Sequence, residues 1–364
     1  MSNALLDLNA TSRAASWRFD LYDGSDYQGT LTLADRGSPP NLSVDTSRAI
    51  KRTLTGVVLM PGEIEEIDVV RWSMKLVMLL NDGSQWPQGT FRWADVSRPV
   101  VSSMDGVVQM GAVCNFVDQL MIVDQQLDRS VSYPPGTNIT DAIVALLAEL
   151  PIEFSVMSSS AMISPEAEAV SWNIGASRLK IINDLAAMIG YHDLYFNNAG
   201  VGILAPMPDP LVVNADVLQY PVGQRTFFGT ATRSTNLLDL PNRFVVVNNG
   251  ATQVPVFGEY DIPADAPHSF ENRGFFVTQV EQFQGIASSA DATYAAQSLG
   301  RMWRFPYETV EFAGPPDPRH DHYDIVNFEG DQFLELSHNV MLRDGSDHQH
   351  ILRRTYGVSA GGGV

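Results

Sequence analysis

The sequence of 364 residues has a single cysteine, Cys114, and few basic side chains. One cysteine excludes an intrachain disulfide framework and any zinc site built from several cysteines. Its neighbours are apolar, so we expect a buried, unreactive thiol. Lys and Arg number 23 against 42 Asp and Glu, a formal net charge of −19 at pH 7. Such a surface repels phosphate backbones and anionic membranes, which argues against a sequence-reading nucleic-acid binder and against membrane docking.

Long hydrophobic runs and the signatures of common enzymes are also missing. No stretch of about 18 apolar residues occurs, and no signal peptide is visible, so we expect neither membrane insertion nor secretion. The sequence contains no P-loop, no His-Glu-x-x-His motif and no Gly-x-Ser-x-Gly nucleophile elbow. Gly200, Gly202 and Ala205 match the loose spacing of a dinucleotide fingerprint, but Pro206 follows where a phosphate-binding helix should begin. This segment is interpreted as a plain β-hairpin.

Alternating apolar and polar residues dominate the chain before residue 130 and return after about residue 211. The pattern predicts strands near 17–21, 69–80, 89–96 and 106–117, joined by turns rich in glycine and proline. Repeated hairpins of this kind favour a barrel or a sandwich. The length of 364 residues is too great for one ordinary core and suggests two to four domains. Apolar residues make up 45% of the chain, which excludes disorder of the chain as a whole.

Helical spacing interrupts the β pattern between about 131 and 206. One helix is expected after Thr140 as its N-cap, and a second from about Ser177 to Ile189, with Gly190 after its end. A third helix is expected after Ser288, within the later β region. The predicted fold class is therefore α+β, mainly β.

An acidic group near residue 65 is the first candidate for chemistry. Glu63, Glu65, Glu66 and Asp68 could supply an acid and a base in a hydrolase cleft. Only two isoleucines stand among these acids, and we favour a solvated loop or strand edge.

A histidine-rich segment is the second candidate. His320, His322 and Asp324 would share one face of a strand and could hold a divalent metal. The segment directly precedes an apolar strand, however, and a polar lead into that strand explains it without a metal. His348 and His350 are interpreted as part of a second polar turn. We therefore predict no catalytic residue, no cofactor and no metal site.

The order of several short motifs resembles the hub proteins of phage tail tips and baseplates, including the hub of contractile-tail phages and the N-terminal part of siphophage tail-associated proteins. Each motif is short, and the order of the set carries the resemblance. The matching stretches are 86–91 (Trp-Pro-Gln-Gly-Thr-Phe), 106–128, the helix start at 137–150, the Trp-x-x-Gly-x-Ser helix motif at 172–191, 242–247, the helix at 290–303 and His-Tyr-Asp-Ile-Val at 322–326.

The resemblance implies two β-barrel tube domains interrupted by a small α+β domain. The corresponding division is 1–130 for the first barrel, 131–210 for a peripheral α+β domain, 211–358 for the second barrel with one helix, and 359–364 for a flexible tail. It also implies a homotrimer whose six barrels form a pseudo-sixfold ring at the virion tail tip, assembled in the host cytoplasm. The implied partners are the distal tail or tube protein, the tape measure protein and tip fibre or spike proteins, and DNA passes through the lumen without specific binding.

Three classes of function follow from these observations. A structural hub without catalysis agrees with the missing motifs and with the order of β, α+β and β regions. A cell-wall-degrading tail enzyme would need one of the two candidate groups above. A receptor- or carbohydrate-binding tip module would need exposed aromatic platforms. The tryptophans lie within apolar patterns that favour core packing instead; they are Trp17, Trp72, Trp86, Trp93, Trp172 and Trp303.

Overall fold

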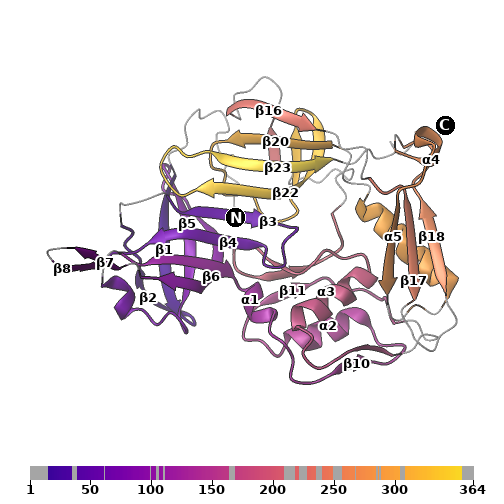
Figure 1. Cartoon of the computed structure of the whole chain (residues 1–364), viewed down its shortest axis with the longest axis horizontal. Helices are drawn as coiled ribbons and strands as arrows, with labels where there is room; N and C mark the ends of the chain where they lie inside the picture. The colour runs from indigo at the N-terminus through magenta and orange to yellow at the C-terminus, as the bar shows by residue number, and fades with distance from the viewer. Residues whose placement is uncertain are drawn as a thin grey trace.

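The computed structural model describes most of the chain. The described residues are 15–34, 39–60, 62–98, 100–103, 106–109, 111–163, 169–208, 218–220, 228–234, 240–248, 256–266, 268–283, 286, 288–303 and 308–354. Strands dominate them and five helices are present, which confirms the mainly β, α+β fold class (Figure 1). None of the helices in these ranges is both long and apolar enough to cross a bilayer.

A sheet of 13 strands is the largest element of the fold, and it combines both ends of the chain. Along its main path the strands are β16 (Phe228–Ser234), β20 (Glu308–Gly314), β23 (His348–Arg354), β22 (Asp331–Met341), β3 (Asn41–Asp45), β4 (Arg52–Val58), β9 (Val113–Asp118), β6 (Gln85–Ser97), β5 (Ser73–Leu80), β1 (Ala15–Asp23) and β2 (Asp26–Thr30). Two further strands, β21 (Ile325–Phe328) and β15 (Leu218–Tyr220), continue from β22.

The junction within this sheet is the antiparallel pairing of β22 with β3, where Val340 lies opposite Leu42. The late strands are accordingly seen directly beside the early ones in Figure 1. One hydrogen-bonded sheet thus contains strands from both segments that were assigned to barrels, and the division into two closed barrels remains a prediction.

Two strand boundaries differ from the periodicity. The apolar run from Val69 enters β5 only at Ser73, because the Asp68 carboxylate accepts hydrogen bonds from the backbone N–H groups of Val70 and Arg71 and holds a turn there. The strand expected over 106–117 is divided into β8 (Gly106–Gln109), which pairs with β7 (Val100–Ser103), and β9. Residues between such strands follow local hydrogen bonds that apolar periodicity does not encode.

The central helical segment forms an α+β unit below the large sheet (Figure 1). Helices α2 (Ile139–Leu147) and α3 (Arg178–Met188) share a buried core with residues of three pairs of short strands. These are β10 (Val131–Tyr133) with β12 (Val170–Trp172), and β14 (Gly202–Leu204) with β11 (Phe154–Val156) and with β13 (Tyr195–Phe196). Ser177, where the second helix was expected to begin, is the N-cap of α3. Helix α2 is capped by Asn138 rather than Thr140, because the Asn138 side chain accepts from the Asp141 N–H at 3.0 Å. The core of this unit also includes α1 (Leu120–Val123).

A second small unit lies at the right of Figure 1. Strand β17 pairs with β18 and β19, and helix α5 packs against β17 and β18. The bounds are β17 (Arg243–Asn248), β18 (Phe257–Asp261), β19 (Thr278–Phe283), α4 (Phe270–Arg273) and α5 (Ser289–Trp303). Its buried cluster, with Phe244 and Val246 at the centre, is separate from the cores of the large sheet. The third helix thus exists where the sequence places it, packed on its own three-stranded sheet.

Candidate functional site

The histidine-rich segment does not form the strand face that its spacing suggests. Residues 315–324 form turns, and β21 begins only at Ile325. The Asp324 carboxylate accepts from the Asp321 N–H at 2.6 Å, and Tyr323 has a left-handed backbone with φ 59. These features turn the chain between the two histidines, so the candidate residues His320, His322 and Asp324 do not share one face of a strand.

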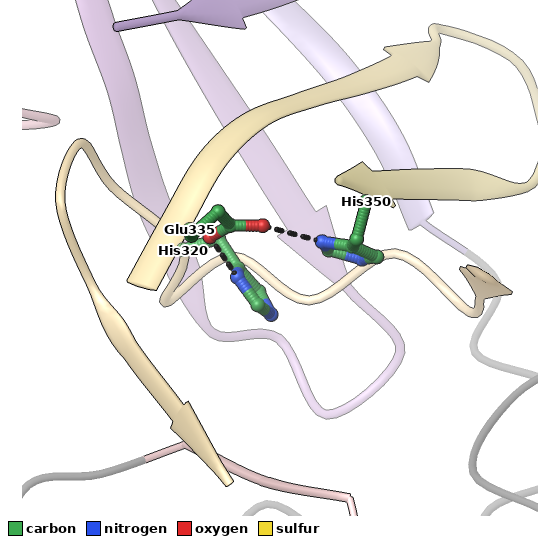
Figure 2. Close-up of side chains that lie close together, drawn as sticks. All are labelled: His320, Glu335 and His350. Atoms are coloured by element: carbon green, nitrogen blue, oxygen red, sulfur yellow. Dashed lines mark hydrogen bonds and ion pairs between the residues drawn. The ribbon is translucent and has the colours of Figure 1, made fainter. Parts of the chain in front are cut away.

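His320 joins a different set, which the sequence analysis missed. Its Nδ1 donates to one oxygen of Glu335 at 2.6 Å, and His350 Nδ1 donates to the other oxygen at 2.7 Å. The three side chains are at most 1% exposed. Figure 2 shows both rings directed at the same carboxylate, from the loop before β21, from β22 and from β23.

A β-bulge directs Glu335 into the interior. The register between β22 and β23 shifts between Glu335 and Ser337, and three successive residues, Phe333, Leu334 and Glu335, are buried. A regular strand would alternate its side chains between the two faces, whereas a bulge re-aims one of them. The carboxylate thereby accepts hydrogen bonds from His320 and His350, and the raised pKa of His320 makes that ring the one that balances its charge.

Two more imidazoles pack against this set. His348 Nδ1 accepts from the Asp317 N–H at 3.3 Å, so the proton of neutral His348 lies on Nε2, which donates to His338 Nδ1 at 2.9 Å. The ring of His350 lies 4.1 Å from that of His348 and 4.3 Å from that of His320, centroid to centroid. His348 and His350 are therefore buried on β23, and their interpretation as a polar turn is wrong.

Burial and the Glu335 carboxylate act in opposite directions on the protonation of the two histidines. Burial alone would lower the pKa of His320 and raise that of Glu335, but their mutual attraction outweighs it, so the pKa of His320 is raised and that of Glu335 is lowered. Burial, together with the charges of His348 and His320, lowers the pKa of His350 to about 3. His350 is thus neutral, and its Nε2 is buried without a hydrogen-bond partner in the part of the chain that the structure describes.

A second buried group surrounds Asp321 on the other side of the loop. Arg52 donates to Asp321 at 2.9 Å, and the Asn198 N–H donates to the other carboxylate oxygen at 2.7 Å. His322 donates from Nδ1 to Asp321 at 3.0 Å, and its pKa is lowered to about 4, chiefly by burial. The loop therefore connects β4, the hairpin of the α+β unit and the histidine set.

The remaining candidates lie apart from this site. Glu63, Glu65 and Glu66 form a short 3-10 helix (Glu63–Glu66) near the surface, where Glu63 accepts from the Thr32 N–H at 2.7 Å. Asp68 is exposed in the turn before β5. The described cavities at Ile139 and Met188, at Asp45 and Tyr323, and at Arg129 and Glu149 are lined by other residues.

Other residues from the sequence analysis have structural positions. The segment at Gly200 and Gly202 is an antiparallel hairpin, as interpreted. Cys114 is fully buried, and burial raises the pKa of its thiol to about 12. Trp172 is buried and donates from Nε1 to Asp184 at 2.8 Å, and Trp93 is buried against Phe116. The side chain of Trp303 lies outside the described residues.

Several solved structures have a fold similar to that of this chain. No protein-family model matches the sequence, and no curated protein matches it. Among solved structures, the chain is similar to the tail protein from Neisseria meningitidis MC58, with a TM-score of 0.62 and 12% identity over 93% of this chain and 97% of that one. It is similar to the 43 kDa tail protein of prophage MuSo2 from Shewanella oneidensis, with a TM-score of 0.59 and 11% identity over 93% and 98% of the two chains.

A third similar structure is the prophage tail protein gp18 from Listeria monocytogenes EGD-e, with a TM-score of 0.56 and 10% identity over 94% of this chain and 96% of that one. In each case the similarity extends over nearly the whole of both chains, so it concerns the arrangement of all the units and not one shared module. The chain therefore has the fold of phage tail proteins, which confirms the resemblance that the order of its motifs predicts.

Proposed function

We propose that the chain is a structural component of a virion tail tip or baseplate, where it acts as a hub without catalytic activity. The observation that carries the proposal is the end-to-end similarity to three tail proteins of different bacterial species. Fold alone does not define a function, but a likeness over the whole length of both chains supports a shared architectural role. The histidine set supports the same role, because its side chains are closed to a substrate.

In this proposal, three copies form a ring with pseudo-sixfold symmetry that continues the tail tube. The path of the large sheet ends at β2 and β16, and four of the five residues of β2 are exposed. A sheet edge has backbone groups available for pairing, so a regulated assembly that covers them is favourable. The neighbours of such a ring are the distal tail or tube protein, the tape measure protein and tip fibre or spike proteins.

Oligomeric state tests this assembly. We expect threefold particles in negative-stain class averages of the purified chain, and a trimer mass in light scattering at moderate salt. Low salt should favour dissociation, because each copy carries a net charge of −19 and the repulsion between copies is only weakly screened at low ionic strength. Rings with two or six identical copies would contradict the proposal.

The charge of the chain is the basis for DNA passage through the ring. Three copies carry a formal charge of −57, and an acidic inner wall would keep DNA mobile by repulsion. Basic side chains on that wall would instead retain DNA through the release of counterions. We expect no measurable binding of duplex DNA at physiological salt. Tight, salt-sensitive binding would refute passage without retention, while the fold would be unaffected.

A further inference from the structure

We propose that His320, Glu335 and His350 form a structural binding site for one divalent transition metal ion of the zinc class. One potential ligand atom from each residue lies within 4.8 Å of the other two. The three side chains come from a loop and two strands, and they converge on one point in the interior (Figure 2). This inference goes beyond the proposed hub function and does not depend on it.

The donor set suits this class of metal. Two imidazole nitrogens and a carboxylate are borderline ligands that bind Zn²⁺ and related ions, whereas Ca²⁺ and Mg²⁺ prefer oxygen ligands throughout. Metal–ligand bonds of this kind are about 2.0–2.2 Å long. Both Nδ1 atoms already face the carboxylate at 2.6 and 2.7 Å, so a metal ion between them would take the place of the two Nδ1 protons. Both oxygens of Glu335 face the imidazoles, so two nitrogens and two oxygens are available.

The protons that a metal displaces have defined destinations. His320 Nε2 lies 2.7 Å from the Tyr220 hydroxyl, so a ring that binds metal through Nδ1 keeps its Nε2 proton in that hydrogen bond. For His350, the Nε2 atom is the unpartnered buried nitrogen, and it takes the proton when Nδ1 becomes a ligand. Metal binding therefore releases at most one proton, from His320, and leaves both imidazoles neutral as ligands must be.

Packing holds the two rings in place. The ring of His350 stacks on Phe312, with centroids 4.7 Å apart and an angle of 17° between the planes. It also contacts the ring of His348. Restraint of this kind reduces the rearrangement that binding requires. The site is structural rather than catalytic, because its three ligand residues are buried and a substrate cannot reach the ion.

A metal ion here would anchor the loop at 315–324 to the large sheet. The same loop contacts β4 through Arg52 and the α+β unit through Asn198. Ion binding would thus stabilise the junction of three parts of the chain, because a ligand that binds only the folded state adds to its stability.

The test uses the tag-free, full-length protein. After removal of metal with a chelator, titration with Zn²⁺ should show one equivalent bound and a rise in melting temperature, and elemental analysis should give one ion per chain. Co²⁺ in place of Zn²⁺ should produce the visible absorption of a four-coordinate site. Stripped protein that binds neither ion, or that shows no thermal shift, would overturn the proposal.

Variants assign the site. Glu335→Gln and, separately, His350→Gln should weaken Zn²⁺ binding at least about tenfold. His348→Gln is the matched control, since it removes a buried imidazole of the same cluster outside the three ligands. It should keep one equivalent of Zn²⁺, whatever its basal stability. Unchanged binding in folded Glu335→Gln, or loss of binding only in His348→Gln, would refute the assignment. Ring formation is measured separately, so failure of this site and failure of the hub proposal are distinguishable.

Discussion

Arg52, which is buried, and Asp321, whose side chain is 19% exposed, form an ion pair across 269 positions of sequence, with Nη2 of Arg52 donating to Oδ1 of Asp321 at 2.9 Å. Arg52 also donates through Nη1 to the Gln88 carbonyl at 2.8 Å. The pair therefore links β4, the start of β6 and the loop before β21. We expect these parts to unfold together, because the loss of one contact leaves a buried charge without its partner.

Substitution of Arg52 tests this link. Arg52→Met should reduce the free energy of unfolding by about 3–5 kcal/mol, since Asp321 would remain largely buried without its cation. Chemical denaturation followed by circular dichroism measures the loss. The double variant Arg52→Met, Asp321→Asn should lose less than the sum of the two single variants.

The matched control is Arg48, which pairs with Asp45 at 3.0 Å but has a side chain that is 62% exposed. Arg48→Met should change the free energy of unfolding by no more than about 0.5–1 kcal/mol, because exposed ion pairs contribute little. Equal losses for Arg48→Met and Arg52→Met would contradict the structural importance of the buried pair.

Gly258 on β18 tests the packing of α5. A Cβ atom at this position would lie 2.1 Å from the backbone nitrogen of Thr293, so only glycine permits the close approach of strand and helix. Gly258→Ala should destabilise this unit by about 1–3 kcal/mol or more. Hydrogen exchange should locate faster opening in β17, β18 and α5. Glu259→Ala, at the exposed neighbouring position, should leave exchange nearly unchanged.

His192 is a source of acid sensitivity outside the histidine set. Burial lowers its pKa, while the neighbouring Asp193 raises it and Lys51 lowers it further; its ring also stacks on Tyr323 and contacts Tyr195. In the unfolded chain His192 takes up a proton near its ordinary pKa of about 6.5, whereas the folded protein takes it up only at lower pH. The contribution of His192 to the free energy of unfolding is therefore fully present above about pH 6.5 and is lost as the pH falls below that value.

His192→Asn should remove this contribution. The dependence of unfolding free energy on pH should become shallower by up to about 1.4 kcal/mol per pH unit, which corresponds to one proton. Denaturation at a series of pH values below 7, with wild type and variant in parallel, measures the difference. Parallel curves for the two proteins would rule out His192 as the titrating group.

Limited proteolysis tests the predicted domain map. Serine and alanine are frequent at 157–169, and we expect the first cleavage there. Residues 164–168 lie outside the described part, and Met157 and Met162 beside them are exposed. The hairpin over 69–96 is the internal control, because β5 is paired with both β1 and β6. Earlier cleavage in that hairpin would contradict the map.

Local patterns predicted many of the elements but not their ends. The start of α3 was predictable near Ser177, because the apolar stripe begins directly after it. At α2 the sequence analysis predicts Thr140 as the cap, whereas the structure uses Asn138, with Thr140 donating to its side-chain oxygen at 2.8 Å. Apolar periodicity locates the helix but does not specify which polar residue before it makes the capping hydrogen bond.

The histidine set shows why the candidate site was missed. The spacing of His348 and His350 places both on one face of a strand, and this signal was present in the sequence. Their partner Glu335 is directed inward by a bulge, and His338 lies opposite His350 only in the register of β22 with β23. A bulge moves a side chain to the other face and is not encoded in residue spacing.

The mainly β class, the helical interruption, the acidic charge and the order of motifs that resembles tail hubs were predictable from the sequence, because they depend on composition and short-range periodicity. The pairing of β3 with β22, the packing of α5 on its own sheet and the contact of His320 with Glu335 rather than Asp324 became evident only in the folded chain. Those contacts depend on register, bulges and turns that form when distant segments pack together, and the free energy of that packing is a property of the whole chain.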